Sequence, residues 1–219
     1  MLGLPDELGK SPNAPLRVLV LGAHADDIEI GCGGTVLRLL AERPHMDIHW
    51  AVLSGGGTPR EGEALASANA FLVGAPHPHV SVASFRDGHF PFVGSDVKDY
   101  IEDNFKSIDP HLVLTHARED RHQDHRLVSD LTWNTFRGKA VIAEYEIPKW
   151  DGDLGRPNAY VQLDPATADR KVALLMEHFA GQHTKPWYDA ETFRGLLRLR
   201  GVEAACKYAE AFICRKLVW

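Results

Sequence analysis

The chain has 219 residues, of which 44% are hydrophobic and 25% are charged, and its formal net charge is −6. This is the balance of an ordinary globular protein, long enough for one domain with a substantial core. The negative charge argues against nucleic acid or an anionic membrane as the main partner, and no apolar stretch approaches the roughly 20 residues of a membrane span. Three cysteines without a pairing pattern favour a reduced, cytoplasmic protein.

Apolar runs typical of strands alternate with amphipathic patterns typical of helices over the first two thirds of the chain. We predict strands at 17–21, 47–53, 80–85, 112–115 and 141–147, and helices at 34–42, 61–73, 96–107 and 125–136. This order predicts an α/β, Rossmann-like fold, in which a mostly parallel sheet carries helices on both faces.

The pattern changes after Pro148, where a loop of turn-forming residues begins. Beyond that loop we predict a short strand at 161–163, helices at 166–179 and 191–200, and a closing strand at 209–216. We therefore expect residues 1–219 to form a single domain. Residues 1–15 would be a flexible lead-in, and residues from about 148 to 219 a small C-terminal extension on the substrate side.

A cluster of polar side chains follows the first predicted strand. The unbroken apolar run 18–21 fits a strand buried on both faces, and helical spacing of apolar residues resumes at 36. Between them lie His24, Asp26, Asp27 and Glu29, which we place in the loop at the carboxyl end of the strand, where open α/β sheets bind ligands. One histidine and three carboxylates so close together are costly to bury unless a positive charge lies among them. We therefore predict a divalent metal here.

A second polar cluster, residues 116–125, also lies between a predicted strand and a predicted helix. The two clusters should fall at the same edge of the sheet, about a hundred residues apart in sequence. Together they can supply two histidines and one carboxylate with open coordination positions, which is typical of a catalytic metal rather than a structural one.

These motifs resemble those of a known family. Residues 23–35, AHADDIEIGCGGT, resemble the His-Pro-Asp-Asp-x-Glu-x-Gly-x-Gly-Gly motif of the LmbE/PIG-L-type zinc-dependent N-acetylglucosaminyl deacetylases. Residues 122–125, HQDH, are similar to that family's His-x-Asp-His motif. An Arg-containing loop at 54–63 and the ending YAEAF at 208–212 extend the similarity over most of the chain.

Two positions depart from the family pattern. Ala25 and Gln123 stand where the family usually has proline, and neither change removes a candidate ligand.

The resemblance implies a Zn²⁺ ion held by His24, Asp27 and His125, with Fe²⁺ as the alternative ion, and Asp26 as the general base. Zinc can lower the pKa of a bound water to about 7, and Asp26 would accept the proton of that water. His122 is our candidate for stabilising the oxyanion and protonating the leaving amine. Asp124 would orient a histidine.

For several other polar and aromatic residues, the sequence allows two interpretations each. Arg60 and Arg86 would each contact substrate or form a surface ion pair, and residues 86–88 fit a simple turn. Glu29 would support a ligand or interact with a helix N-terminus. The aromatic residues of the late loops would form a wall for a sugar or pack in the core: Trp150, Trp187 and Tyr188.

The leading functional hypothesis is removal of an acetyl group from an N-acetylated amino sugar or its glycoside. The first alternative is an amidase or deacylase acting on a non-sugar N-acyl amine. A non-catalytic nucleotide- or sugar-binding module is a more distant alternative, because the carboxylates in the first loop would repel a pyrophosphate. A non-haem Fe(II) oxygenase uses the same ligand types, but its expected scaffold is all-β. The partner would be a small molecule. The composition neither requires nor forbids a homo-oligomer.

Overall fold

The computed structural model describes residues 15–43 and 45–217, so the predicted flexible lead-in lies almost entirely outside the described residues. The larger elements follow in this order: β1 (Arg17–Gly22), α1 (Asp27–Glu42), β2 (Asp47–Ser54), α2 (Pro59–Phe71), β3 (His77–Phe85), α3 (Gly94–Phe105), β4 (Leu112–His116), α4 (Gln123–Phe136), β5 (Val141–Tyr145), β6 (Ala159–Leu163), α5 (Pro165–His178), α6 (Ala190–Glu203) and β7 (Tyr208–Ile213). Within the described part of the chain, no helix is long and apolar enough to cross a membrane.

These strands form one seven-stranded sheet in the order β3-β2-β1-β4-β5-β7-β6. The first five strands pair in parallel, and β7 runs antiparallel to both β5 and β6. The mostly parallel α/β fold is therefore confirmed. The segment after residue 148 continues the same sheet through β6 and β7.

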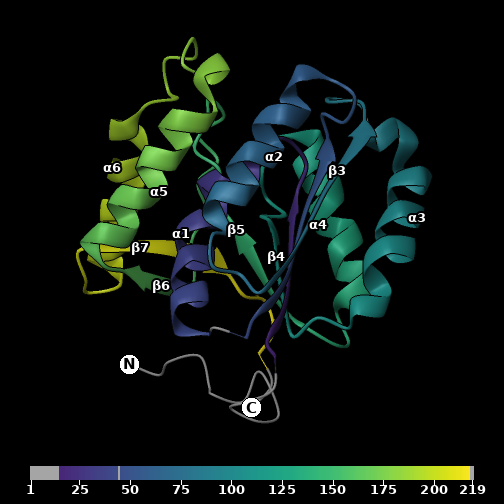
Figure 1. Cartoon of the computed structure of the whole chain (residues 1–219), viewed down its shortest axis with the longest axis horizontal. Coiled ribbons are helices and arrows are strands. Elements are labelled where there is room, and N and C mark those ends of the chain that lie inside the picture. Colours follow the sequence, from purple (N-terminus) through teal and green to yellow (C-terminus); the bar gives the residue numbers. More distant parts are fainter. Residues whose placement is uncertain (1–14, 44, 218–219) are drawn as a thin grey trace.

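Helices cover both faces of the sheet, with α1, α2 and α5 on one side and α3 and α4 on the other (Figure 1). Side chains of β1 alternate between the two cores: Val18 and Val20 belong to the first, Leu19 and Leu21 to the second, and all four are fully buried. A strand buried on both faces has this continuous apolar pattern.

The glycine-rich segment that precedes residue 35 is helical, so the expected loop is wrong there: α1 begins at Asp27 rather than at 34. The glycines permit close packing. A Cβ on Gly31 would lie 2.1 Å from Cδ2 of Tyr145, and one on Gly33 would lie 2.5 Å from Cε1 of Phe71. Asp27 and Glu29 consequently lie in the first turn of α1, whereas His24 and Asp26 precede it.

Candidate active site

The turn between β1 and α1 brings the first cluster to the carboxyl edge of the sheet. Asp26 has a φ of 99° and a ψ of −23°, a left-handed conformation that non-glycine residues seldom adopt. Its side chain makes no capping hydrogen bond to the helix. The side chain of Asp27 instead lies against the preceding turn, where its Oδ2 accepts the backbone N–H of His24 at 2.7 Å. The two adjacent carboxylates therefore have different surroundings.

The turn between β4 and α4 brings the second cluster to the same edge. His122 is the N-cap of α4, and its Nδ1 accepts the backbone N–H of Asp124 at 3.2 Å. His125 follows in the first turn of α4 and is 2% exposed. Because His122 Nδ1 accepts a hydrogen bond, the Nε2 of a neutral His122 carries the hydrogen.

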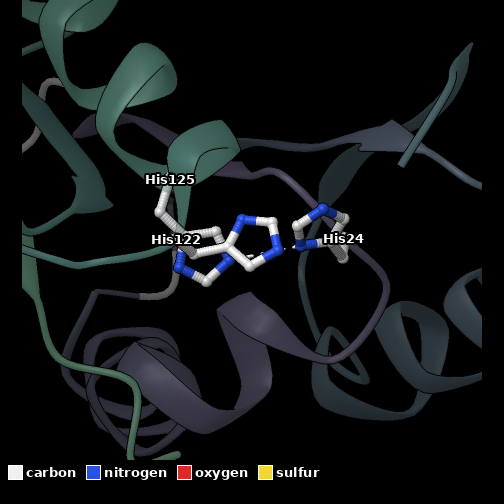
Figure 2. Close-up of side chains that lie close together, drawn as sticks. All are labelled: His24, His122 and His125. Atoms are coloured by element: carbon white, nitrogen blue, oxygen red, sulfur yellow. Dashed lines mark hydrogen bonds between the residues drawn. The ribbon is translucent and has the colours of Figure 1, made fainter. Parts of the chain in front are cut away.

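Three donor atoms from the two clusters converge. His24 Nδ1 lies 3.2 Å from His125 Nε2 and 3.3 Å from Asp27 Oδ2, and His125 Nε2 lies 3.5 Å from Asp27 Oδ2. Ligands of a tetrahedral zinc ion with bonds of about 2.0–2.1 Å lie about 3.3–3.4 Å from one another. The triangle of atoms therefore has the dimensions of one face of such a coordination sphere. Figure 2 shows the rings of His24, His122 and His125 gathered at this point.

Each of the two converging histidines has a carboxylate on its opposite nitrogen. His24 Nε2 lies 3.1 Å from Oδ2 of Asp124. This Oδ2 also accepts the backbone N–H of Gly88, and Oδ1 of the same carboxylate accepts that of Phe90. His125 Nδ1 lies 2.9 Å from Oδ2 of Asp120. Carboxylates in these positions fix the tautomer and orientation of metal-binding histidines. The donor set and its supports thus fit a divalent transition metal.

The adjacent carboxyls Asp26 and Asp27 have opposite pKa shifts. Burial, together with the charge of Asp27, raises the pKa of Asp26 to about 7. Burial acts in the same direction on Asp27, but the nearby His125, His116 and His24 hold its pKa well below its ordinary value. The pair therefore divides into one carboxyl whose ionised form is favoured and one that can exchange a proton near neutral pH.

Most of the predicted site residues line one cleft. Asp26, His122 and the three convergent side chains are joined there by Arg60, Arg86 and residues from the loops after β5 and α5. Trp150 and Trp187 line it as well, with their rings edge to face at 6.5 Å, whereas Tyr188 is buried and packs against Trp187. Asp124 is fully buried and does not line the cleft.

The two arginines have different surroundings. Arg60 donates to the carbonyl of Ala25, pairs with Glu63 and lies 3.4 Å from Asp26 Oδ2. Arg86 is exposed at the rim. Arg60 is thus fixed to the turn that carries Asp26, while Arg86 is open to the cleft.

Sequence reasoning gave no role to three residues that surround the convergent atoms. Asp120 supports His125, and it also pairs with Lys149 at 2.9 Å. Asp87 lies 3.0 Å from His24 Nε2, within a turn at the residues where the sequence allowed one. His116 lies 3.3 Å from Asp27, but its Nε2 accepts the N–H of Ala23 and has no further lone pair for a metal. The density of carboxylates and histidines in 116–125 was the available signal for Asp120 and His116, and no sequence signal marked Asp87.

A buried ion pair fixes the helix that carries Asp27. Glu210 of β7 accepts the N–H groups of Gly34 and Thr35 at 2.8 and 2.6 Å, and Lys171 of α5 donates to the carbonyl of Ile30 at 2.6 Å. In a regular α-helix the N–H of Gly34 would bond to that carbonyl. The two charged side chains, 2.5 Å apart, are thus inserted into the hydrogen-bonding ladder of α1.

Fold and geometry together define an α/β protein with a candidate two-histidine, one-carboxylate metal site at the carboxyl edge of its sheet. Residues 19–136 match the family described as PIG-L, GlcNAc-PI de-N-acetylase. The chain belongs to this PIG-L (LmbE-like) deacetylase family. It is also 30% identical over 184 residues to the uncharacterized deacetylase YaiS of Escherichia coli K12, covering 80% of this chain and 97% of that protein.

Solved structures share the fold at lower identity. N,N'-diacetylchitobiose deacetylase from Pyrococcus horikoshii superposes with a TM-score of 0.66 at 20% identity, covering 94% of this chain and 85% of the other. GalB, the 4-carboxy-2-hydroxymuconate hydratase from Pseudomonas putida KT2440, gives 0.72 at 19% identity, covering 93% and 98%. Because one is a deacetylase and the other a hydratase, the shared fold alone does not define a reaction.

Proposed function

We propose that this protein is a metal-dependent hydrolase that removes an acetyl group from an N-acetylated amino sugar or its glycoside. Membership of a deacetylase family supports the reaction class. The observation that carries the proposal is the triangle formed by His24 Nδ1, Asp27 Oδ2 and His125 Nε2, with edges of 3.2–3.5 Å beside an open cleft.

His24, Asp27 and His125 would hold the ion, which we propose is Zn²⁺, with Fe²⁺ as the alternative. A bound ion of this kind supplies Lewis acidity, which acidifies water and polarises a carbonyl group. Asp124 and Asp120 contact the opposite ring nitrogens of His24 and His125 and so would hold both imidazole rings in their orientation. A neutral His125 suits this role, and burial lowers its pKa to about 4.

Asp26 would act as the general base. Its carboxyl lines the cleft beside the proposed ligands, and its pKa of about 7 is matched to proton transfer at neutral pH. Arg60 lies 3.4 Å from Asp26 Oδ2 and, held by Ala25 and Glu63, would fix the position of this carboxylate.

His122 would donate a hydrogen bond to the developing oxyanion. Its Nδ1 is occupied by the N–H of Asp124, so Nε2 presents the hydrogen. Burial and the neighbouring His24 lower the pKa of His122, so a neutral donor is expected. We assign Asp124 a positioning role, because its buried carboxylate contacts His24 and backbone N–H groups rather than the cleft.

Aromatic and basic side chains in the cleft favour a sugar-like substrate. Trp150 is 69% exposed and meets Trp187 edge to face, which provides apolar surface for the face of a pyranose ring. Arg86 would contact substrate directly. We expect Arg86→Ala to raise KM without lowering kcat, whereas Arg60→Ala should lower kcat, because it disturbs Asp26. Kinetics on one acetylated substrate separates these outcomes.

The test combines metal content with acetate release. Protein purified without chelator should contain one equivalent of zinc or iron in this site and release acetate from N-acetylglucosamine or one of its glycosides. Asp26→Asn should keep the metal and lose about 10²- to 10⁴-fold in kcat, while His125→Ala should lose the metal. Asp96→Asn, a surface change on α3, serves as the control. Undiminished turnover by Asp26→Asn would refute the assigned base.

The alternative substrate class, non-sugar N-acyl amines, is tested in the same assay. A panel that pairs each acetylated amino sugar with an acetylated linear amine of similar size distinguishes the two. Higher kcat/KM for the linear amines would favour the deacylase alternative over the sugar deacetylase.

A further inference from the structure

A further group of side chains that could hold a metal ion lies at the amino ends of β2 and β3, and none of its members lines the cleft. His49 of β2 and His79 of β3 are register partners, and their rings stack at 4.3 Å with 9° between their planes. Asp47 precedes His49 by two residues, and alternation along a strand places both side chains on one face of the sheet.

One carboxylate oxygen of this group lacks a hydrogen bond. Oδ1 of Asp47 is buried and has no hydrogen-bond partner. It lies 3.7 Å from Nε2 of His49 and 3.6 Å from Nε2 of His79. These distances exceed the 2.7–3.2 Å of hydrogen bonds, and they approach the spacing of about 3.3–3.4 Å between ligands on one tetrahedral metal. A buried acceptor oxygen therefore lies between two imidazole nitrogens, at distances close to those between ligands of a shared cation.

We propose that Asp47, His49 and His79 bind a second divalent transition-metal ion, of the class that prefers imidazole and carboxylate ligands, such as Zn²⁺. Small rotations of the stacked rings would turn both Nε2 atoms toward the ion, and water would complete the coordination because His79 is half exposed. Burial and the neighbouring His79 also lower the pKa of His49, which leaves this imidazole neutral.

This group is separate from the proposed catalytic ligands. Ser54 lines the cleft at the other end of β2, five residues after His49, which corresponds to about 16 Å along a strand. The proposal therefore stands independently of the proposed function.

The ion would connect the edge strand to the body of the sheet. β3 is the outermost strand next to β2, and its far end, with Ser84 and Phe85, lines the cleft. Edge strands have only one hydrogen-bonded neighbour. A metal bridging His49 and His79 would fix the start of β3 and make the edge strand more resistant to local opening.

Zinc counting on tag-free protein tests this proposal. Metal-depleted chains are dialysed against buffered Zn²⁺, and bound zinc per chain is measured by mass spectrometry. We expect two equivalents for the wild type, one for His79→Asn and one for His125→Ala. The double variant should bind none. His77→Asn, a change of the same residue type on the same strand outside the group, should still bind two.

The dissociation constant of the second equivalent should rise at least tenfold in His79→Asn and Asp47→Asn, with the circular dichroism spectrum and acetate release unchanged. Zinc should also slow amide hydrogen exchange at the start of β3 in the wild type but not in His79→Asn. Equal zinc content in wild type and His79→Asn, or an equal loss in His77→Asn, would overturn the proposed ligand set. If the wild type binds the equivalent that depends on His79 but not the one that depends on His125, the result supports this site and counts against the proposed function.

Discussion

Removal of Lys171 tests how α1 is held in place. The Lys171–Glu210 pair is 97% buried on each side, and Glu210 also accepts two N–H groups from within α1. In Lys171→Met the Glu210 carboxylate stays buried without its cation. In comparable buried pairs, removal of one partner lowers the free energy of unfolding by about 3–5 kcal/mol. For a protein of this size that corresponds to a fall in Tm of about 6–20 °C.

The same substitution at the surface provides the control. Lys98 lies 3.0 Å from Glu102 on α3, with 45% of the Lys98 side chain exposed. An exposed pair of this kind contributes little net stability, so Lys98→Met should leave the urea unfolding midpoint close to that of the wild type. Urea unfolding followed by circular dichroism, with and without zinc, measures both variants.

A double variant separates charge from packing. Glu210→Gln in the Lys171→Met background removes the isolated charge, so the double variant should be more stable than the sum of the two single losses predicts, by at least about 2 kcal/mol. Strict additivity, or a loss no larger than in Lys98→Met, would refute the reasoning.

Two further predictions concern the outer supports of the site and the glycines of the helices. Asp120→Ala should lower the zinc affinity of the proposed site about 10- to 100-fold, because His125 loses the carboxylate on its Nδ1. The control is Asp153→Ala, which also removes a carboxylate from Lys149. Metal titration should show a zinc affinity within twofold of the wild type for this control. Gly31→Ala should destabilise the fold by about 1–3 kcal/mol or more, because the new methyl group would overlap the aromatic ring of β5. Gly62→Ala, in the open face of α2, should stabilise it by about 0.5–1 kcal/mol; equal unfolding midpoints for the two variants would contradict this packing argument.

The meeting of the two polar clusters could be predicted from the sequence because it depends on a general property of parallel sheets. Each cluster directly follows a buried strand, and β1 and β4 are neighbours in the sheet. The carboxyl ends of neighbouring parallel strands share an edge, so no knowledge of side-chain contacts was required. The alternation of strands and helices was sufficient for the fold class for the same reason.

The start of α1 and the support of the proposed metal ligands could not be predicted in this way. Gly31 and Gly33 were interpreted as loop formers, because a single sequence does not show that Tyr145 and Phe71 pack against them. From the sequence, Asp124 was expected to orient a histidine, and Asp120 had no assigned role. Only the turn geometry decides that Asp120 supports His125 and Asp124 supports His24.

The conformation of Asp26 argues against a purely structural role for the first cluster. A carboxylate before a helix ordinarily caps it by accepting an N–H group of the first turn, yet Asp26 makes no such bond and adopts a φ of 99° that glycine would tolerate better. Strain of about 1–3 kcal/mol at such a position persists when the surrounding structure enforces it, and it concentrates at functional sites. Here it turns the Asp26 carboxyl into the cleft beside Arg60, while the adjacent Asp27 faces three histidines. Two neighbouring carboxylates can hold a metal and exchange a proton separately only if the backbone directs them apart in this way.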